Sequence, residues 1–149
     1  MANDTHGVDG EKWTGFDLDG TLAEYNGWKG IDHIGDPIKP MCDLVRKLHS
    51  EGKLVKILTA RVAPRNDDSD SNDARGYIEK WCEKNLGFIP SITHEKDSCM
   101  DVLYDDRAIQ VIPNKGISIE EASKKLIESI DKKSTPQEVK ELLKYLTEE

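Results

Sequence analysis

The stretch WTGFDLDGTL, residues 13–22, carries the strongest structural signal in the chain. Its first four residues are mostly apolar and predict a strand, and Asp17 and Asp19 follow at the strand's end. Alternate residues of a strand face the same side, and Gly20 lets the backbone turn beyond the strand. The two carboxylates can therefore meet in one place with different tasks, since one can attack an electrophile while the other moves protons.

The rest of the chain alternates short apolar runs with helical patterns. A second strand is expected at residues 54–58, ending at Thr59, and a later one at residues 100–104, ending at Asp105 and Asp106. Such alternation predicts an α/β fold, a three-layer Rossmann-like parallel sheet flanked by helices. Shorter strands are expected at 89–93 and 108–112, core helices around 41–48 and 77–82, and tail helices around 119–130 and 135–146.

The length of 149 residues suits a single domain. We expect a core over about residues 12–116 and a helical extension over 117–149. Right-handed crossovers place the carboxyl ends of parallel strands at one edge of the sheet, where such sheets bind ligands. The polar residues expected to meet at this edge are Asp17, Asp19, Thr59, Asp105 and Asp106.

The composition narrows the class of partner and the compartment. The 29 acidic residues outnumber the 21 basic ones, and the net charge of −8 disfavours a broad surface for duplex nucleic acid. No apolar run approaches the ~20 residues that span a bilayer, and the first residues lack the basic and apolar regions of a secretion signal. The three cysteines are too scattered for structural zinc or a disulfide framework. We therefore expect a cytoplasmic protein without a membrane partner.

Several carboxylates in one pocket repel one another and raise one another's pKa, and a hard divalent cation such as Mg²⁺ relieves that repulsion. Magnesium then bridges most naturally to a phosphate oxygen. Thr21 and Thr59 could donate hydrogen bonds to the phosphate, and Lys96 could supply a positive charge. The ordinary alternatives are an Asp-x-Asp turn, a strand-end threonine and a solvated lysine.

Together these residues resemble the haloacid dehalogenase (HAD) superfamily of phosphotransferases. The resemblance covers residues 13–112 and consists of four motifs in the family's order. The first is Asp-x-Asp-Gly-Thr after an apolar strand, at residues 17–21, and the second is the strand ending in Thr59. The third is a lysine before the fourth strand, for which Lys96 is the candidate, and the fourth is the acidic pair Asp105-Asp106.

The resemblance implies a Mg²⁺-dependent phosphomonoester hydrolase. Asp17 would be the nucleophile that forms an aspartyl-phosphate, and Asp19 would protonate the leaving group and then activate water. Magnesium would be held by the Asp17 carboxylate, the Asp19 backbone carbonyl and Asp105, with Asp106 in support. Thr59 and Lys96, with Thr21, would hold the phosphoryl oxygens. The gaps between motifs leave no room for a cap domain, so residues 23–36 would form only a small flap, with Tyr25 and Trp28 as candidate substrate contacts.

The phosphatase domain of phage polynucleotide kinases is the most similar subgroup. It has a strand ending in Ser-Gly-Arg, compared with Thr59-Ala60-Arg61 here, and a later strand ending in Asp-Asp-Arg, compared with residues 105–107. Its resemblance adds Arg61, Arg75 and Arg107 as possible substrate contacts and a nucleotide or a nucleic-acid phosphate end as a possible substrate. A kinase domain is not expected, because the chain has no GxxxxGK[ST] motif.

Other interpretations stay open at this stage. The substrate could be a small metabolite, or the chain could bind phosphate and metal without turnover. Residues 68–79 partly match a calcium loop, although the position normally held by glycine is Asp73. A solvated loop with a helix cap is the simpler interpretation of residues 66–73. The tail helices could cover an edge of the sheet or form a contact between two copies of the chain.

Overall fold

The structure is a computed structural model that describes residues 10–65, 70–131, 137, 140, 141 and 144. The chain divides into two compact units, residues 1–106 and 107–149.

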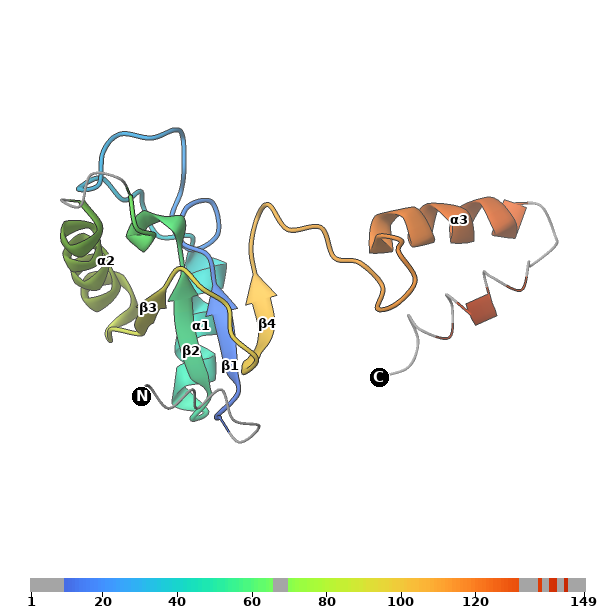
Figure 1. Ribbon diagram of the computed structural model, residues 1–149, viewed down its shortest axis with the longest axis horizontal. Helices are drawn as coiled ribbons and strands as arrows, with labels where there is room; N and C mark the ends of the chain where they lie inside the picture. Colours follow the sequence, from blue (N-terminus) through green and yellow to red (C-terminus); the bar gives the residue numbers. More distant parts are fainter. Residues whose placement is uncertain (1–9, 66–69, 132–136, 138–139, 142–143, 145–149) are drawn as a thin grey trace. The chain divides into compact units, whose positions relative to one another are not determined.

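The first unit is built on a four-stranded, all-parallel sheet with the strand order β3-β2-β1-β4 (Figure 1). The strands are β1 (Trp13–Phe16), β2 (Leu54–Leu58), β3 (Ser91–Thr93) and β4 (Met100–Tyr104). Phe16, the last residue of β1, is in register with Ile57 on one side and Tyr104 on the other. The chain is therefore an α/β protein with helices flanking a parallel sheet, consistent with the three-layer Rossmann-like fold expected from the sequence.

Two helices of the first unit pack on the sheet, α1 (Lys39–Ser50) and α2 (Asp70–Leu86). Pro40 lies in the first turn of α1, where its missing N–H costs no helical hydrogen bond. One hydrophobic cluster joins both helices to β1 and β2, and each of its fully buried Val, Leu, Ile or Phe side chains contributes about 1.5–3 kcal/mol. Its members include Phe16, Ile57, Cys42, Val45, Ile78, Cys82 and Leu86. This packing fixes the ends of the strands, and with them the site.

The connection between β1 and α1, residues 17–38, contains no helix or strand element, which agrees with the expected absence of a cap domain there. Its middle part, residues 24–36, is here called the flap loop. The backbone N–H of Glu24 donates to the carbonyl of Asp36 at 2.8 Å, so the two ends of the flap loop meet. The flap loop therefore begins and ends at the same place, next to the strand ends.

The second unit contains α3 (Ile119–Asp131). The Ser118 hydroxyl accepts a hydrogen bond from the N–H of Glu121 at 3.1 Å and caps the start of this helix. Among the described residues of this unit, Ile112 and Ala122 are buried in a small apolar cluster, against which Ile117 and Ile119 pack. The four described residues after position 136 are helical, and the remainder of the expected helix at 135–146 lies outside the described residues. Of the helices described, none has the length and apolar character to cross a bilayer.

Three sequence expectations need correction. Residues 108–112 form no strand; Val111 only makes an isolated bridge with Ser118, because a turn containing Asn114 and Gly116 with positive φ returns the chain there without a sheet to join. The strand expected at 89–93 is shorter and begins at Ser91. The calcium loop considered for residues 68–79 is not formed by the described part of that range, because residues 70–79 belong to the continuous helix α2, which cannot wrap around an ion. The start of α2 at Asp70 falls within residues 66–73, where the sequence predicted a loop and a helix cap.

Candidate functional site

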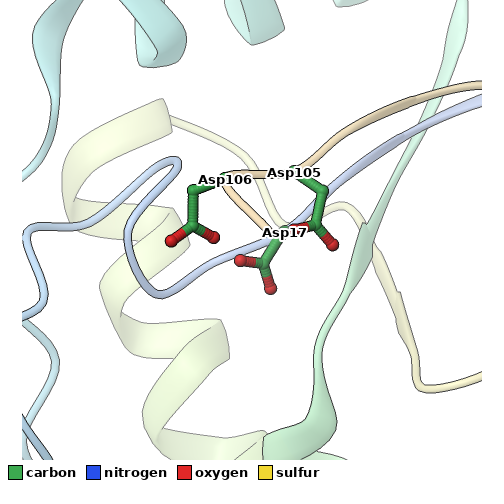
Figure 2. Close-up of side chains that lie close together, drawn as sticks. All are labelled: Asp17, Asp105 and Asp106. Carbon is green, nitrogen blue, oxygen red and sulfur yellow. The ribbon is translucent and has the colours of Figure 1, made fainter. Parts of the chain in front are cut away.

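Three carboxylates gather where β1 and β4 end. Asp17 directly follows β1, and Asp105 and Asp106 directly follow β4. Each offers an oxygen, and these oxygens all lie within 4.8 Å of one another (Figure 2). The N–H of Asp17 donates to the carbonyl of Tyr104 at 2.9 Å, which holds the two strand ends together. The sequence prediction that these acids meet at the carboxyl edge of the sheet is confirmed.

The carboxylates of this cluster, which we call the acidic triad, destabilise one another's charge. Burial and the negative charge of Asp105 raise the pKa of Asp17 to about 7, and the hydrogen bond from the Leu18 backbone opposes this rise. The neighbouring Asp106 raises it further. A hard divalent cation bound between these oxygens would remove the repulsion, and oxygen-only donors suit Mg²⁺. The donor set therefore fits the expected metal.

The Gly-Thr pair that follows Asp19 shapes the acidic triad. The Thr21 hydroxyl is buried and accepts a hydrogen bond from the N–H of Asp106 at 3.1 Å. Gly20 has a φ of +89°, and a Cβ atom there would collide with the Asp106 carboxylate. The sequence suggested Thr21 as a phosphate ligand; in the structure its oxygen is engaged with the backbone of a triad residue. Both residues thus set the position of Asp106.

Asp19 lies in a different environment from the acidic triad. Its carboxylate is held by Arg61 in a two-pronged ion pair, with Nε to Oδ2 at 2.7 Å and Nη2 to Oδ1 at 2.8 Å. The Arg61 side chain is only 5% exposed. Among the described residues the Asp19 carboxylate is not part of the triad, so the structure separates the two acids of the DxDGT motif. The expected metal contact of Asp19 through its backbone carbonyl stays a prediction.

Arg61 also binds the flap loop. It donates to the carbonyl of Ile31 at 3.3 Å and to that of His33 at 2.9 Å, and its guanidinium lies 4.9 Å from the ring centre of Trp28. Asp19, Arg61 and the flap loop together line a polar pocket of about 230 Å³, and Tyr25 is part of its wall. The pocket is smaller than the roughly 300–1,000 Å³ that drug-sized ligands occupy. It therefore suits a small group next to Asp19.

The other expected phosphate ligands differ in how well they are fixed. Thr59 is buried at the end of β2, caps the short helix η1 (Ala60–Val62), and its hydroxyl accepts from the N–H of Arg61 at 3.2 Å. Lys96 is exposed in the connection between β3 and β4 and makes no hydrogen bond or ion pair with another described residue. Its ammonium group is therefore open to an anion from solution.

The expected substrate contacts fall into two groups. Tyr25 and Trp28 lie in the flap loop, and Trp28 is 49% exposed. Arg61 and Arg75 have internal partners, since Arg75 donates to the carbonyl of Ile92 in β3 at 2.9 Å. Arg107 is exposed and is the first residue of the second unit. The partnership of Arg61 with Asp19 was missed from the sequence; its only signal was an arginine two residues after the strand-end threonine.

No family model matches the chain, and no curated protein matches it. Among solved structures, the chain is similar to one described as "Structure of the conserved protein coded by locus from Bacteroides thetaiotaomicron", with 20% sequence identity and a TM-score of 0.46. That similarity covers 85% of this chain and 94% of the other. A function must therefore be inferred from the chain's own site.

Proposed function

We propose that this chain is a Mg²⁺-dependent phosphomonoester hydrolase of the HAD type. The observation that supports this proposal is the separation of Asp17 from Asp19. Asp17 lies with Asp105 and Asp106 in a donor set for a hard cation, while Asp19 is held by Arg61 beside a small pocket. A nucleophile and a proton-transfer group need such different surroundings within a few ångströms of one phosphoryl group.

In the proposed reaction, an oxygen of Asp17 attacks phosphorus and the bond from phosphorus to the ester oxygen breaks. Asp19 gives a proton to the departing oxygen and later takes one from the water that hydrolyses the aspartyl-phosphate. Arg61 uses one lone pair of each Asp19 oxygen, so each oxygen keeps another for proton transfer. Magnesium, held by the acidic triad, would neutralise charge on the phosphoryl oxygens. Thr59 and Lys96 would complete phosphate binding.

An aryl phosphate assay tests the proposal directly. Wild-type protein should hydrolyse the ester with Mg²⁺ and lose activity in EDTA, and Asp17→Asn should be inactive. Asp101→Asn is a suitable control, because Asp101 is an exposed residue near the opposite end of β4, paired with Lys12. A protein that binds Mg²⁺ but hydrolyses no member of a broad phosphate panel would be a binding protein that lacks turnover, and the enzyme proposal would be wrong.

The substrate class we propose is a nucleotide or a nucleic-acid phosphate end, with a small metabolite as the alternative. Trp28 supports the former, because its half-exposed ring could stack on a base and Arg65 lies 5.4 Å from the ring centre. The internal partners of Arg61 and Arg75 reduce the number of arginines that could meet a polyanion. Equal hydrolysis of a 3′-phosphorylated oligonucleotide and of small esters would favour the metabolite. The cytoplasmic location expected from the sequence is likewise a proposal.

A further inference from the structure

The flap loop is fixed firmly at its neck. Besides the hydrogen bond from Glu24 to Asp36, Ala23 and Pro37 form an isolated bridge. The indole N–H of Trp81, on α2, donates to the carbonyl of Gly35 at 2.9 Å. A Cβ atom at Gly35 would collide with the Glu24 backbone, so the two arms of the neck are in close contact. The core therefore holds the base of the flap loop.

The far part of the flap loop is held differently, by hydrogen bonds from Arg61 of η1, with the guanidiniums of Arg61 and Arg65 near the ring of Trp28. Arg61 donates to the carbonyls of Ile31 and His33, and its Nη2 serves both His33 and Asp19. The indole of Trp28 lies against the same guanidinium. Because a guanidinium is rigid and planar, its bonds to the flap loop and to Asp19 cannot be adjusted independently. A shift of the far part of the flap loop should therefore reorient the Asp19 carboxylate.

We propose that Trp28 is a positioning residue that acts through Arg61 on Asp19. The inference depends on the proposed function for its catalytic consequence. Trp28 covers the guanidinium and keeps it desolvated, which strengthens the ion pair to Asp19. Loss of the indole would admit water to Arg61 and loosen Asp19. The nucleophile Asp17, held in the acidic triad, would be unaffected.

Leaving-group dependence separates this role from a general loss of structure. A misplaced proton donor slows the hydrolysis of esters that have a basic leaving group. An acidic leaving group departs without a proton, so hydrolysis of its ester is little affected. Trp28→Ala should lower kcat/KM for phenyl phosphate by ~10-fold and kcat/KM for dinitrophenyl phosphate by less than ~2-fold. The ~10-fold loss is smaller than the roughly 10²–10⁴-fold effect of a complete general acid, because Asp19 is misplaced and not removed. Trp28→Phe should retain most of the wild-type value. Tyr77→Ala removes another exposed aromatic residue with a cationic neighbour, Lys80, and should change neither rate.

An equal loss on both esters, or no loss on either, would overturn the proposal. A second measurement does not depend on activity. In urea unfolding, the midpoint shifts caused by Trp28→Ala and Asp19→Asn should be non-additive in the double variant, because both residues act on Arg61. Additive shifts would also overturn it. If wild-type protein hydrolyses no phosphoester while the shifts are non-additive, the proposed function fails and the structural link from Trp28 to Asp19 stands.

Discussion

Asp17 and Asp19 are two residues apart, yet their surroundings are opposite. Asp17 lies among two other carboxylates with oxygens within 4.8 Å, and burial and repulsion raise its pKa to about 7. Asp19 is held by a buried guanidinium in the same part of the fold. The acidic triad has no cationic side chain among the residues that form it and would gain from a bound cation, whereas Asp19 already has the guanidinium of Arg61 as its partner. The comparison shows how one short motif can place two carboxylates in different surroundings, as the proposed reaction needs.

The largest effect is expected when the two acids are exchanged for amides. Asp17→Asn should abolish detectable turnover and weaken Mg²⁺ binding, since it removes the nucleophile and one oxygen donor. Asp19→Asn should lower kcat by about 10²–10⁴-fold, the range for a general acid–base group, with unchanged Mg²⁺ affinity. Steady-state kinetics and calorimetric Mg²⁺ titration measure the two properties. Equal loss of Mg²⁺ affinity in both variants would contradict the separation of the two regions.

The next effect concerns the stability of the Asp19 region. Arg61→Met leaves the partly buried carboxylate of Asp19 without its partner, and should lower the free energy of unfolding by up to about 3 kcal/mol. This value is at the low end for broken buried ion pairs, because the Asp19 side chain keeps some exposure. Lys39→Met breaks an exposed pair with Asp43 and should lower the free energy of unfolding far less, because solvent screens exposed charges. Urea unfolding in EDTA compares them. Similar values for the two variants would mean that burial adds nothing to the Arg61 pair.

Gly20→Ala should disturb the acidic triad and leave the ion pair between Asp19 and Arg61 intact. The added methyl group would displace the Asp106 carboxylate and strain the backbone, which has a positive φ. Mg²⁺ affinity should fall by about 10-fold or more, as is typical when a group that orients a ligand is lost. Gly52→Ala is the matched control, because it also has a positive φ but open space around its Cβ position. If both variants bind Mg²⁺ equally well, Asp106 does not contribute to the metal site.

A further effect, which does not involve bound metal or turnover, is a pH dependence of metal-free stability. Because the folded-state pKa of Asp17 is raised from 3.8 to about 7, the folded protein binds more protons than the unfolded chain between these values. The contribution of Asp17 to stability is therefore full below pH 4 and is lost as the pH rises through 7. Urea unfolding in EDTA at pH 5 and pH 8 should show this loss in wild-type protein and not in Asp17→Asn. Saturating Mg²⁺ should reverse it.

The sequence was sufficient for the four strands that form the sheet and for the acidic triad. Apolar runs ending in acids predicted that Asp17, Asp105 and Asp106 would meet, because parallel strands share one carboxyl edge. The position of Asp19 was not predictable in the same way. Beyond the strand end, side-chain direction depends on the positive φ of Gly20 and on a partner 42 residues away, Arg61. Residues 108–112 looked like a strand because they are apolar, but a strand also requires a neighbour with which to pair.

The most direct test of the central claim is a Mg²⁺ titration of wild-type protein and Asp105→Asn, with hydrolysis of an aryl phosphate followed over the same range. The acidic triad should give saturable Mg²⁺ binding, activity should rise in parallel with occupancy, and Asp105→Asn should shift both curves together to concentrations at least ~10-fold higher. Unchanged binding in Asp105→Asn, or wild-type activity that does not depend on Mg²⁺, would contradict the assignment of Asp17, Asp105 and Asp106 as the metal site of a phosphatase.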